Sequence, residues 1–332
     1  MNNNQEQEET VIEKVFEIDG KRWYLPSTWA EQGEGFRNFK AKPEDVWIMT
    51  QPRSGTTLTQ ELVWLLANDL DYETAKKLHL LDRSPQLDVS LYPGMWEKCQ
   101  IVRASREDPK VLEALPVDTS KPSYEVYVDL PNPRIIKTHL ALSVHKGILD
   151  SGCKMIYVLR NPKDMLVSRG RMTTGSSNPF YGGSFQSYIR RFIDDESPVP
   201  APYDLCCEYN PYWQHVKEAW AHRDHPNLLF MYYEELRIDL LGAIKKIASF
   251  LGKSYSDEQL AELDAHLDID TFRKNPMVNE LPGLEDRIST FIGKGLIGGW
   301  KEVFTPELDA EIDRWIEKNT KDTDIVFSYS RK

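Results

Sequence analysis

The sequence predicts an α/β fold, a single domain with a central, mainly parallel sheet flanked by helices. Four short apolar runs are typical of buried strands: Val46–Thr50, Arg134–Lys137, Lys154–Leu159 and Leu228–Tyr233. A helical pattern follows each run, which is the alternation that parallel sheets require. The 332 residues are 40% hydrophobic and show no internal repeat or linker, so one large domain is expected.

The other elements follow from local patterns. Polar, acidic Met1–Ile12 predicts a disordered tail ahead of a domain over residues 13–332. Val15–Leu25 alternates around Asp19–Gly20, which indicates a hairpin. Helices are predicted from Thr56 onwards, near Ser143–Asp150, and at Asn161–Met172, Tyr212–His222, Leu240–Leu251, Asp257–His266 and Asp309–Lys318. Arg83–Pro133 predicts connections with little regular structure, and Thr173–Pro211 a surface loop or lid.

Charge and cysteine content exclude several classes of function. The net charge of −11 disfavours general binding to nucleic acid or to anionic membranes, so a local basic cluster must meet any anionic ligand. Neither a signal peptide nor a membrane-spanning run is visible, which predicts a cytoplasmic protein. The four cysteines form no metal-ligand spacing, and the adjacent Cys206 and Cys207 suit a disulfide poorly. Free thiols, a reducing compartment and no metal are expected.

The most informative segment is Val46–Leu58, in which a strand, a tight turn and a helix follow one another. The turn carries Arg53, Ser54, Gly55, Thr56 and Thr57. Free N–H groups at a helix start favour an anion, glycine permits close approach, and the arginine adds positive charge. The alternative is a plain helix cap made by Thr56 or Thr57. The preceding strand and the arginine favour phosphate binding. Walker A features are missing, which disfavours a nucleotide triphosphatase.

Six motifs along the chain carry a family resemblance. They are QPRSGTTLTQELVW, RIIKTHLALS, YVLRNPKDMLVS, WQHVKEAW, LLFMYYEEL and KGLIGGWK, in that order. The set resembles the cytosolic sulfotransferase family from about Pro43 to Phe327, and is most like insect members including retinol dehydratase. The resemblance implies transfer of a sulfonate from 3′-phosphoadenosine 5′-phosphosulfate (PAPS), which leaves PAP. The implied acceptor is a hydroxyl or amine of a small, largely apolar molecule such as a phenol, steroid or retinoid alcohol.

The resemblance also implies catalytic roles. His139 matches the general base that takes the acceptor's proton, although a lone histidine is more often a buried structural residue. Lys137 and Arg53 match cations that stabilise charge on the sulfonate and on the leaving phosphate. Most family members have lysine at the position of Arg53, and the two side chains are not equivalent. His215 is expected to pack in a helix near the site.

The PAPS contacts are carried over in the same way. Arg160 and Ser168 match the pair that holds the 3′-phosphate; Arg160 could instead pair with Asp164. The family's F-x-R-K-G loop reads FIGKG here, so Gly293 replaces an arginine, and either PAPS affinity falls or another basic group substitutes. Leu58 and Ile269 replace the aromatic walls of the adenine site. The residues assigned to PAPS are Arg53, Ser54, Gly55, Thr56, Thr57, Leu58, Arg160, Ser168, Tyr233, Ile269, Phe291, Ile292, Lys294 and Gly295.

Several alternatives stay open at this point. The enzyme could be a dehydratase that works through a transient sulfate ester, or a nucleotide-binding module that has lost catalysis. The acceptor pocket is expected among the loops Leu81–Pro93, Thr173–Pro211 and Asn275–Leu284. The aromatic residues of the middle loop either line it or only pack: Phe180, Tyr181, Phe185, Tyr188 and Tyr209.

Assembly is expected to depart from the family's pattern. Many members dimerise through K-x-x-x-T-V-x-x-x-E, and the matching stretch Lys301–Ala310 reads KEVFTPELDA. Pro306 lacks an N–H group for extended pairing, and it is a favoured first residue of a helix. A monomer, or a dimer built on another surface, is therefore predicted.

Overall fold

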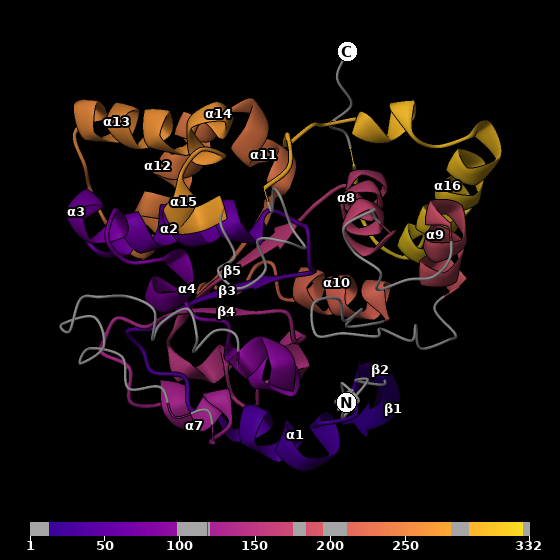
Figure 1. The fold of residues 1–332 in the computed structure, drawn as a ribbon, viewed down its shortest axis with the longest axis horizontal. Coiled ribbons are helices and arrows are strands. Elements are labelled where there is room, and N and C mark those ends of the chain that lie inside the picture. Colours follow the sequence, from indigo (N-terminus) through magenta and orange to yellow (C-terminus); the bar gives the residue numbers. More distant parts are fainter. Residues whose placement is uncertain are drawn as a thin grey trace, which may run out of the picture.

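The core of the molecule is a four-stranded sheet. The computed structural model describes residues 13–97, 118, 120–174, 184–194, 211–279 and 292–327. Within them, β3 (Val46–Thr50), β4 (Ile135–Thr138), β5 (Lys154–Leu159) and β6 (Leu228–Tyr232) pair in the order β4-β3-β5-β6. All three pairings are parallel (Figure 1). The α/β class predicted from the sequence is confirmed.

Helices cover both faces of this sheet, and alternate strand residues fill two separate cores. Ile48 and Ile156 pack with α2 (Thr56–Ala67), α12 (Leu240–Leu251) and α13 (Asp257–Leu267). Trp47 and Tyr157 pack on the other face with α1 (Trp29–Asn38) and α10 (Tyr212–Ala221), as Figure 1 shows. Because both faces are buried, the strands read as nearly continuous apolar runs.

The predicted hairpin is also confirmed. Strands β1 (Glu13–Ile18) and β2 (Lys21–Pro26) are antiparallel, and Ile18 pairs with Lys21 across a two-residue turn. Asp19 and Gly20 both have positive φ, 51° and 75°. Two such residues form the turn whose twist matches that of the flanking strands.

Most of the remaining elements are shorter than three helical turns. The full set is α3 (Tyr72–Ala75), α4 (Leu80–Arg83), η1 (Leu87–Leu91), α7 (Ser123–Tyr127), η2 (Leu142–Val144), η3 (Leu149–Ser151), α8 (Pro162–Thr174), α9 (Phe185–Asp194), α11 (Tyr233–Ile238), α14 (Ile269–Phe272), α15 (Pro276–Asn279), η4 (Gly299–Glu302) and α16 (Pro306–Thr320). No helix in the described part of the chain is long and apolar enough to cross a membrane.

The helix predicted near Ser143–Asp150 is wrong. Two short 3₁₀ turns, η2 and η3, occupy this stretch. Gly147 between them has a φ of 71°, which no right-handed helix accommodates. The N–H group of Lys146 donates to the carbonyl of Arg37 at 3.0 Å, so a distant segment satisfies it.

The loop predicted at Thr173–Pro211 contains a helix. In α9, Tyr188, Ile189 and Phe192 lie on one helical face and are fully buried. Similarly, the stretch predicted to have little regular structure, Arg83–Pro133, contains η1 and α7. Residues 98–117, 119, 175–183 and 195–210 lie outside the described part, as does the predicted tail Met1–Ile12.

One of the four cysteines can be described. Cys153 is free and buried, and burial raises the pKa of its thiol to about 11. A thiol with that pKa is protonated and unreactive at neutral pH. Cys99, Cys206 and Cys207 lie outside the described residues.

Candidate active site

Several of the predicted site residues converge because they follow the carboxyl ends of neighbouring strands. The turn with Arg53 follows β3, His139 follows β4, Arg160 follows β5, and Tyr233 follows β6. Carboxyl ends of parallel strands share one edge of the sheet, and ligands bind where the strand order reverses. The order reverses at β3, since β4 and β5 flank it on opposite sides.

The turn after β3 is built to receive an anion. Gly55, with a φ of 95°, is the N-cap of α2, and it has no side chain that could bond the N–H groups of the first turn. Thr56 and Thr57 are the first helical residues, so the reading of either threonine as the cap is wrong. The hydroxyl oxygen of Ser54 is fully buried and has no hydrogen-bond partner among the described residues. Free N–H groups and an unpaired hydroxyl are what a bound phosphate would satisfy.

Tyr233, the first residue of α11, joins three predicted segments. A Cβ atom at Gly55 would lie 2.3 Å from Cδ2 of its ring, and one at Gly295 would lie 3.0 Å from its hydroxyl oxygen. The guanidinium of Arg160 lies 4.5 Å from the ring centroid. The turn, the end of β5 and the 292–296 loop therefore meet around one aromatic ring.

Arg160 is held by main-chain oxygens. Its Nη1 donates to the carbonyl of Arg53 at 2.9 Å, and its Nη2 to that of Leu296 at 3.2 Å. Its Nε is buried without a partner among the described residues. Asp164 accepts instead from the N–H group of Gly298 at 2.7 Å, so the alternative pairing with Arg160 is not what the structure shows.

The side chain of Arg53 lies beside Ser168. Its Nε donates to the Ser168 hydroxyl at 3.0 Å, across 115 residues of sequence. Because Arg160 bonds the carbonyl of the same arginine, Arg53 connects the two residues predicted to hold the 3′-phosphate. Its guanidinium, predicted for the 5′-phosphosulfate, therefore lies next to the pair predicted for the 3′-phosphate.

His139 is held in a single tautomer. Its Nδ1 lies 2.7 Å from the carbonyl oxygen of Thr50, and because a carbonyl only accepts, Nδ1 carries the proton. Nε2 is then the basic nitrogen. Burial first, and then the charge of Lys137, lower the pKa of His139 to about 3. The imidazole is therefore neutral at pH 7.

Three residues hold His139 in place, and the sequence motifs identified only one of them, His215. Asp88 accepts from the main-chain N–H group of His139 at 3.1 Å, and Thr50 supplies the carbonyl. His215 donates from Nε2 to the carbonyl of His139 at 3.2 Å, so its Nδ1 accepts from the Tyr157 hydroxyl at 2.8 Å. The predicted place of His215, in a helix near the site, is confirmed. A sequence signal for Thr50 exists, since it is the polar residue that ends an apolar strand. No sequence pattern points to Asp88.

Lys137 lies on the face of the sheet that α2 covers. It pairs in register with Ile48, and paired residues of parallel strands point to the same face. Ile48 and Ile135 both belong to the core under α2. Lys137 is only 9% exposed. Its charge is near enough to His139 to lower that pKa, which brings two predicted catalytic residues together.

The structure describes most of the residues predicted for the adenine and for the FIGKG loop. Leu58 is buried in the first turn of α2, and Ile269 begins α14, half-buried. Ile292 packs against the core under α2, and its N–H group donates to Asn279 at 2.6 Å. Lys294 is exposed. Phe291 lies outside the described residues.

The aromatic residues proposed for the acceptor pocket are described only in part. Tyr188 is fully buried in α9, and its hydroxyl accepts from Nε of Arg169 at 3.0 Å. Phe185 packs near Phe304, with ring centroids 6.4 Å apart. Tyr188 thus belongs to the core, and Phe185 packs against it. Phe180, Tyr181 and Tyr209 lie outside the described residues.

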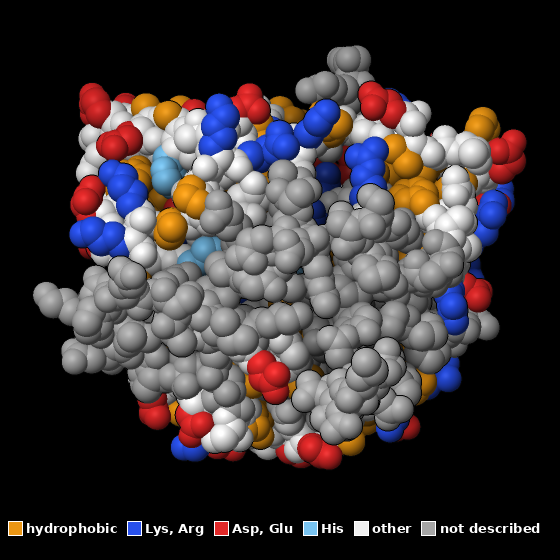
Figure 2. Space-filling view, in the orientation of Figure 1, with side chains coloured by type: hydrophobic (Ala, Val, Ile, Leu, Met, Phe, Trp, Pro, Cys, Tyr) orange, Lys and Arg blue, Asp and Glu red, His pale blue; other side chains and the backbone are white. Residues whose placement is uncertain are grey.

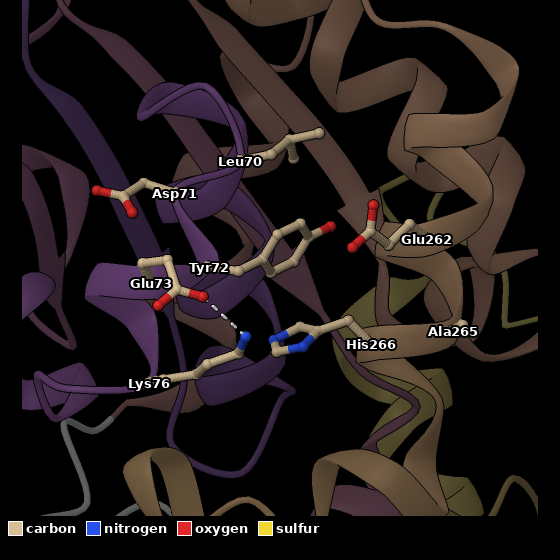
Figure 3. Close-up of a pocket in the computed structure, with 8 residues that line it drawn as sticks. All are labelled: Leu70, Asp71, Tyr72, Glu73, Lys76, Glu262, Ala265 and His266. Carbon is tan, nitrogen blue, oxygen red and sulfur yellow. Dashed lines mark hydrogen bonds and ion pairs between the residues drawn. The ribbon is translucent and has the colours of Figure 1, made fainter.

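A separate pocket of about 520 Å³ lies between α3 and α13. Figure 3 shows Tyr72 in it, with Glu262 and His266 from α13 opposite and an ion pair between Glu73 and Lys76 beside it. None of the predicted site residues lines this pocket. In the described part of the chain, no group of three or more His, Cys, Asp or Glu is placed to hold a metal ion.

A turn with free N–H groups, a neutral buried histidine and cations at one sheet edge suit an enzyme that transfers phosphate or sulfate groups. The chain belongs to the sulfotransferase family, because the family described as "Sulfotransferase domain" matches residues 43–324. Sulfotransferase 4A1 of Homo sapiens is 30% identical over 95% of this chain and 93% of its own. Luciferin sulfotransferase of Photinus pyralis is 31% identical, over 88% and 76%.

Solved structures agree with this assignment. The chain is similar to retinol dehydratase in complex with androsterone and inactive cofactor PAP, with a TM-score of 0.77 and 32% identity over 95% of this chain and 92% of that one. A second structure of retinol dehydratase, with retinol and PAP, has a TM-score of 0.76. The protein is a sulfotransferase that uses PAPS. The Ser54 hydroxyl, unpaired among the described residues, and the N–H groups at the start of α2, which no side chain caps, fit a bound phosphate group.

The close approach of Gly55 to Tyr233 can be tested by adding a methyl group. Gly55→Ala places a methyl group against the ring of Tyr233 at a φ of 95°, so the turn or the ring must shift. We expect PAP affinity to fall by about 10-fold or more, as backbone strain of about 1–3 kcal/mol implies. Gly252→Ala is the matched control, since its φ is 73° but no atom lies within 4 Å of the added methyl group. Calorimetric titration with PAP checks both variants. Wild-type affinity in Gly55→Ala would show that PAP binding does not depend on the geometry of this turn.

Proposed function

We propose that this enzyme transfers a sulfonate from PAPS to a hydroxyl, or an amine, of a small and largely apolar acceptor. The acceptor oxygen forms a bond to sulfur while the bond from sulfur to the 5′-phosphate oxygen breaks, in line. His139 takes the acceptor's proton on Nε2. The observation that carries this proposal is the hydrogen bond from Nδ1 to Thr50, because it leaves Nε2 basic.

The cations act on the charge that develops during transfer. Lys137 and Arg53 are proposed to stabilise the sulfonate oxygens and the leaving phosphate, where negative charge grows most. The burial of Lys137 supports this role, because an ammonium group interacts more strongly with an anion when little water screens it. Arg53 remains protonated throughout, so it stabilises charge and does not donate a proton.

The remaining assignments concern PAPS and the acceptor. The turn Arg53–Thr57 is proposed to hold the 5′-phosphosulfate, and Arg160 with Ser168 the 3′-phosphate. Their convergence at one sheet edge supports both assignments. Tyr233, Leu58 and Ile269 are proposed for the adenine. An apolar alcohol or phenol as acceptor is supported by the androsterone and retinol bound to retinol dehydratase.

Dehydration through a transient sulfate ester is the second candidate. The similarity to retinol dehydratase over 95% of this chain favours it, since that enzyme's name states such an activity. Both candidates require the same transfer step and the same base, and they differ in whether the ester survives. A catalytically lapsed module is less well supported, because Lys137 and His139 are both present and close together.

The test is turnover with ³⁵S-labelled PAPS across a panel of phenols, steroid alcohols and retinoid alcohols, with analysis of products. A labelled, stable acceptor indicates a sulfotransferase in the strict sense. Labelled free sulfate together with a dehydrated acceptor indicates the dehydratase. Absence of both, in a protein that binds PAP, would support a lapsed module and contradict the proposal.

We also propose a cytoplasmic protein that does not use the family's dimer contact. Thr305 caps α16, its hydroxyl accepting from the N–H group of Leu308 at 3.3 Å, and Pro306 begins the helix as predicted. These residues are therefore engaged in a helix start instead of an extended pairing segment.

The assembly prediction has a direct measurement. In light scattering we expect a monomer, or a dimer whose stability is unchanged by Lys301→Ala combined with Thr305→Ala. The reason is that Pro306 and Ala310 remove the N–H group and the carboxylate that the family segment offers. A stable dimer that dissociates on this double substitution would contradict the prediction.

A further inference from the structure

Gly293 leaves a gap in the charge around the proposed 3′-phosphate. Where the family loop has an arginine, this chain has no side chain, and a Cβ at Gly293 would meet no atom of the described residues within 4 Å. A phosphate that carries nearly two negative charges is held in proteins by several cationic or N–H donors. Arg160 alone is a weak substitute for the family's pair of arginines, so a second cation nearby becomes significant.

Arg237 lies where such a cation is needed. It is one helical turn beyond Tyr233 in α11, so both side chains share the face directed at the 292–296 loop. Its Nε donates to the carbonyl of Gly295 at 3.3 Å, and a Cβ at Gly295 would lie 3.0 Å from that same Nε. Arg160 bonds the carbonyl of the next residue, Leu296. The two guanidinium groups thus donate hydrogen bonds to the carbonyls of consecutive residues in one loop.

The charge of Arg237 has no ion-pair partner among the described residues. Its side chain is half-buried. A guanidinium with one main-chain bond keeps its Nη donors for another acceptor. Figure 2 shows Lys and Arg side chains gathered on this face, over α14 and α11 and the adjoining end of α8. The surroundings therefore favour an anion, although the whole chain is acidic.

We propose that Arg237 binds the 3′-phosphate of PAPS, in place of the arginine that Gly293 lacks. This inference rests on the proposed PAPS site and adds a residue that no family motif in this chain identifies. Arg237 approaches the phosphate from α11, and the family arginine would approach it from the loop. The phosphate would then lie between Arg160 and Arg237, near the ring of Tyr233.

The test separates the 3′-phosphate from the rest of the nucleotide. Arg237→Gln should weaken PAP binding by about 10-fold or more, as loss of a charged hydrogen bond implies, with a larger effect at low salt. Binding of AMP, which lacks the 3′-phosphate, should change by less than about twofold. Calorimetric titration measures both ligands. An equal loss for PAP and AMP would mean that Arg237 only supports the loop, which overturns the proposal.

Arg273 provides the matched control. Its Nε likewise donates to a loop carbonyl, that of Ile292, at 3.3 Å, and it too has no ion-pair partner among the described residues. Arg273→Gln should leave PAP affinity unchanged. A loss of PAP affinity in this variant, with none in Arg237→Gln, would assign the role to Arg273 and overturn the proposal.

Moving the positive charge from position 237 to position 293 gives a second, independent test. Gly293→Arg should restore most of the PAP affinity lost in Arg237→Gln, because no described residue occupies the space that the family side chain would enter. No recovery would contradict the view that the two positions serve the same phosphate. If the wild-type protein itself fails to bind PAP, the proposed function fails. If it binds PAP and Arg237→Gln binds equally well, only this inference fails.

Discussion

His139→Ala should lose turnover by at least about 100-fold while it keeps the affinity for PAP. A positioned general base contributes about 10²–10⁴-fold to rate, and His139 is held by contacts to Thr50, Asp88 and His215. Its lowered pKa keeps the imidazole neutral, so the base needs no prior deprotonation at pH 7. Steady-state kinetics with a turned-over acceptor and calorimetry with PAP measure the two effects separately.

A second buried histidine controls for the loss of an imidazole from the core. His145 packs edge-on against Trp47, with ring centroids 4.9 Å apart, and burial lowers its pKa to about 4. His145→Phe keeps the aromatic contact and should retain turnover close to wild type. If His139→Ala also retains it, the histidine is structural and another group must take the proton.

Asp45→Ala should destabilise the fold by about 3–5 kcal/mol, the largest loss of stability expected here. The Asp45 carboxylate accepts two hydrogen bonds from Arg134, one of them from Nε at 2.7 Å, and both side chains are fully buried. Arg134 also donates to the carbonyl of Lys40 at 2.9 Å. Removing the carboxylate leaves a buried guanidinium without a counter-charge beside the first residues of β3 and β4. Urea unfolding measures the change.

The size of this effect depends on burial, which an exposed pair can test. Asp322 accepts from Lys217 at 2.8 Å at the surface, and Asp322→Ala should cost far less than Asp45→Ala. Replacing both partners, as in Asp45→Ala with Arg134→Met, should recover much of the loss, since no unpaired charge remains. A double variant as unstable as Asp45→Ala would show that the carboxylate acts through packing alone.

The sequence by itself determined the sheet and indicated which residues gather at its carboxyl edge. Four apolar runs were long enough to define strands, and Gly55 with its hydroxyl neighbours marked the anion turn, because these signals come from residues close together in the chain. Short-range patterns also identified the hairpin and α12 at its observed bounds, Leu240–Leu251. They failed at Ser143–Asp150, where a carbonyl of distant Arg37 and the φ of Gly147 decide the backbone.

Only the tertiary structure decided the chemical state of the site. The proton on Nδ1 of His139 is placed by the carbonyl of Thr50, 89 residues away, and the carboxylate that holds its main chain comes from Asp88. Arg237 reaches Gly295 across 58 residues. A hydrogen bond requires its donor and acceptor to be placed to within a few tenths of an ångström, on segments that meet only after packing. No local pattern encodes such a contact, so it follows from how helices and loops assemble on the sheet.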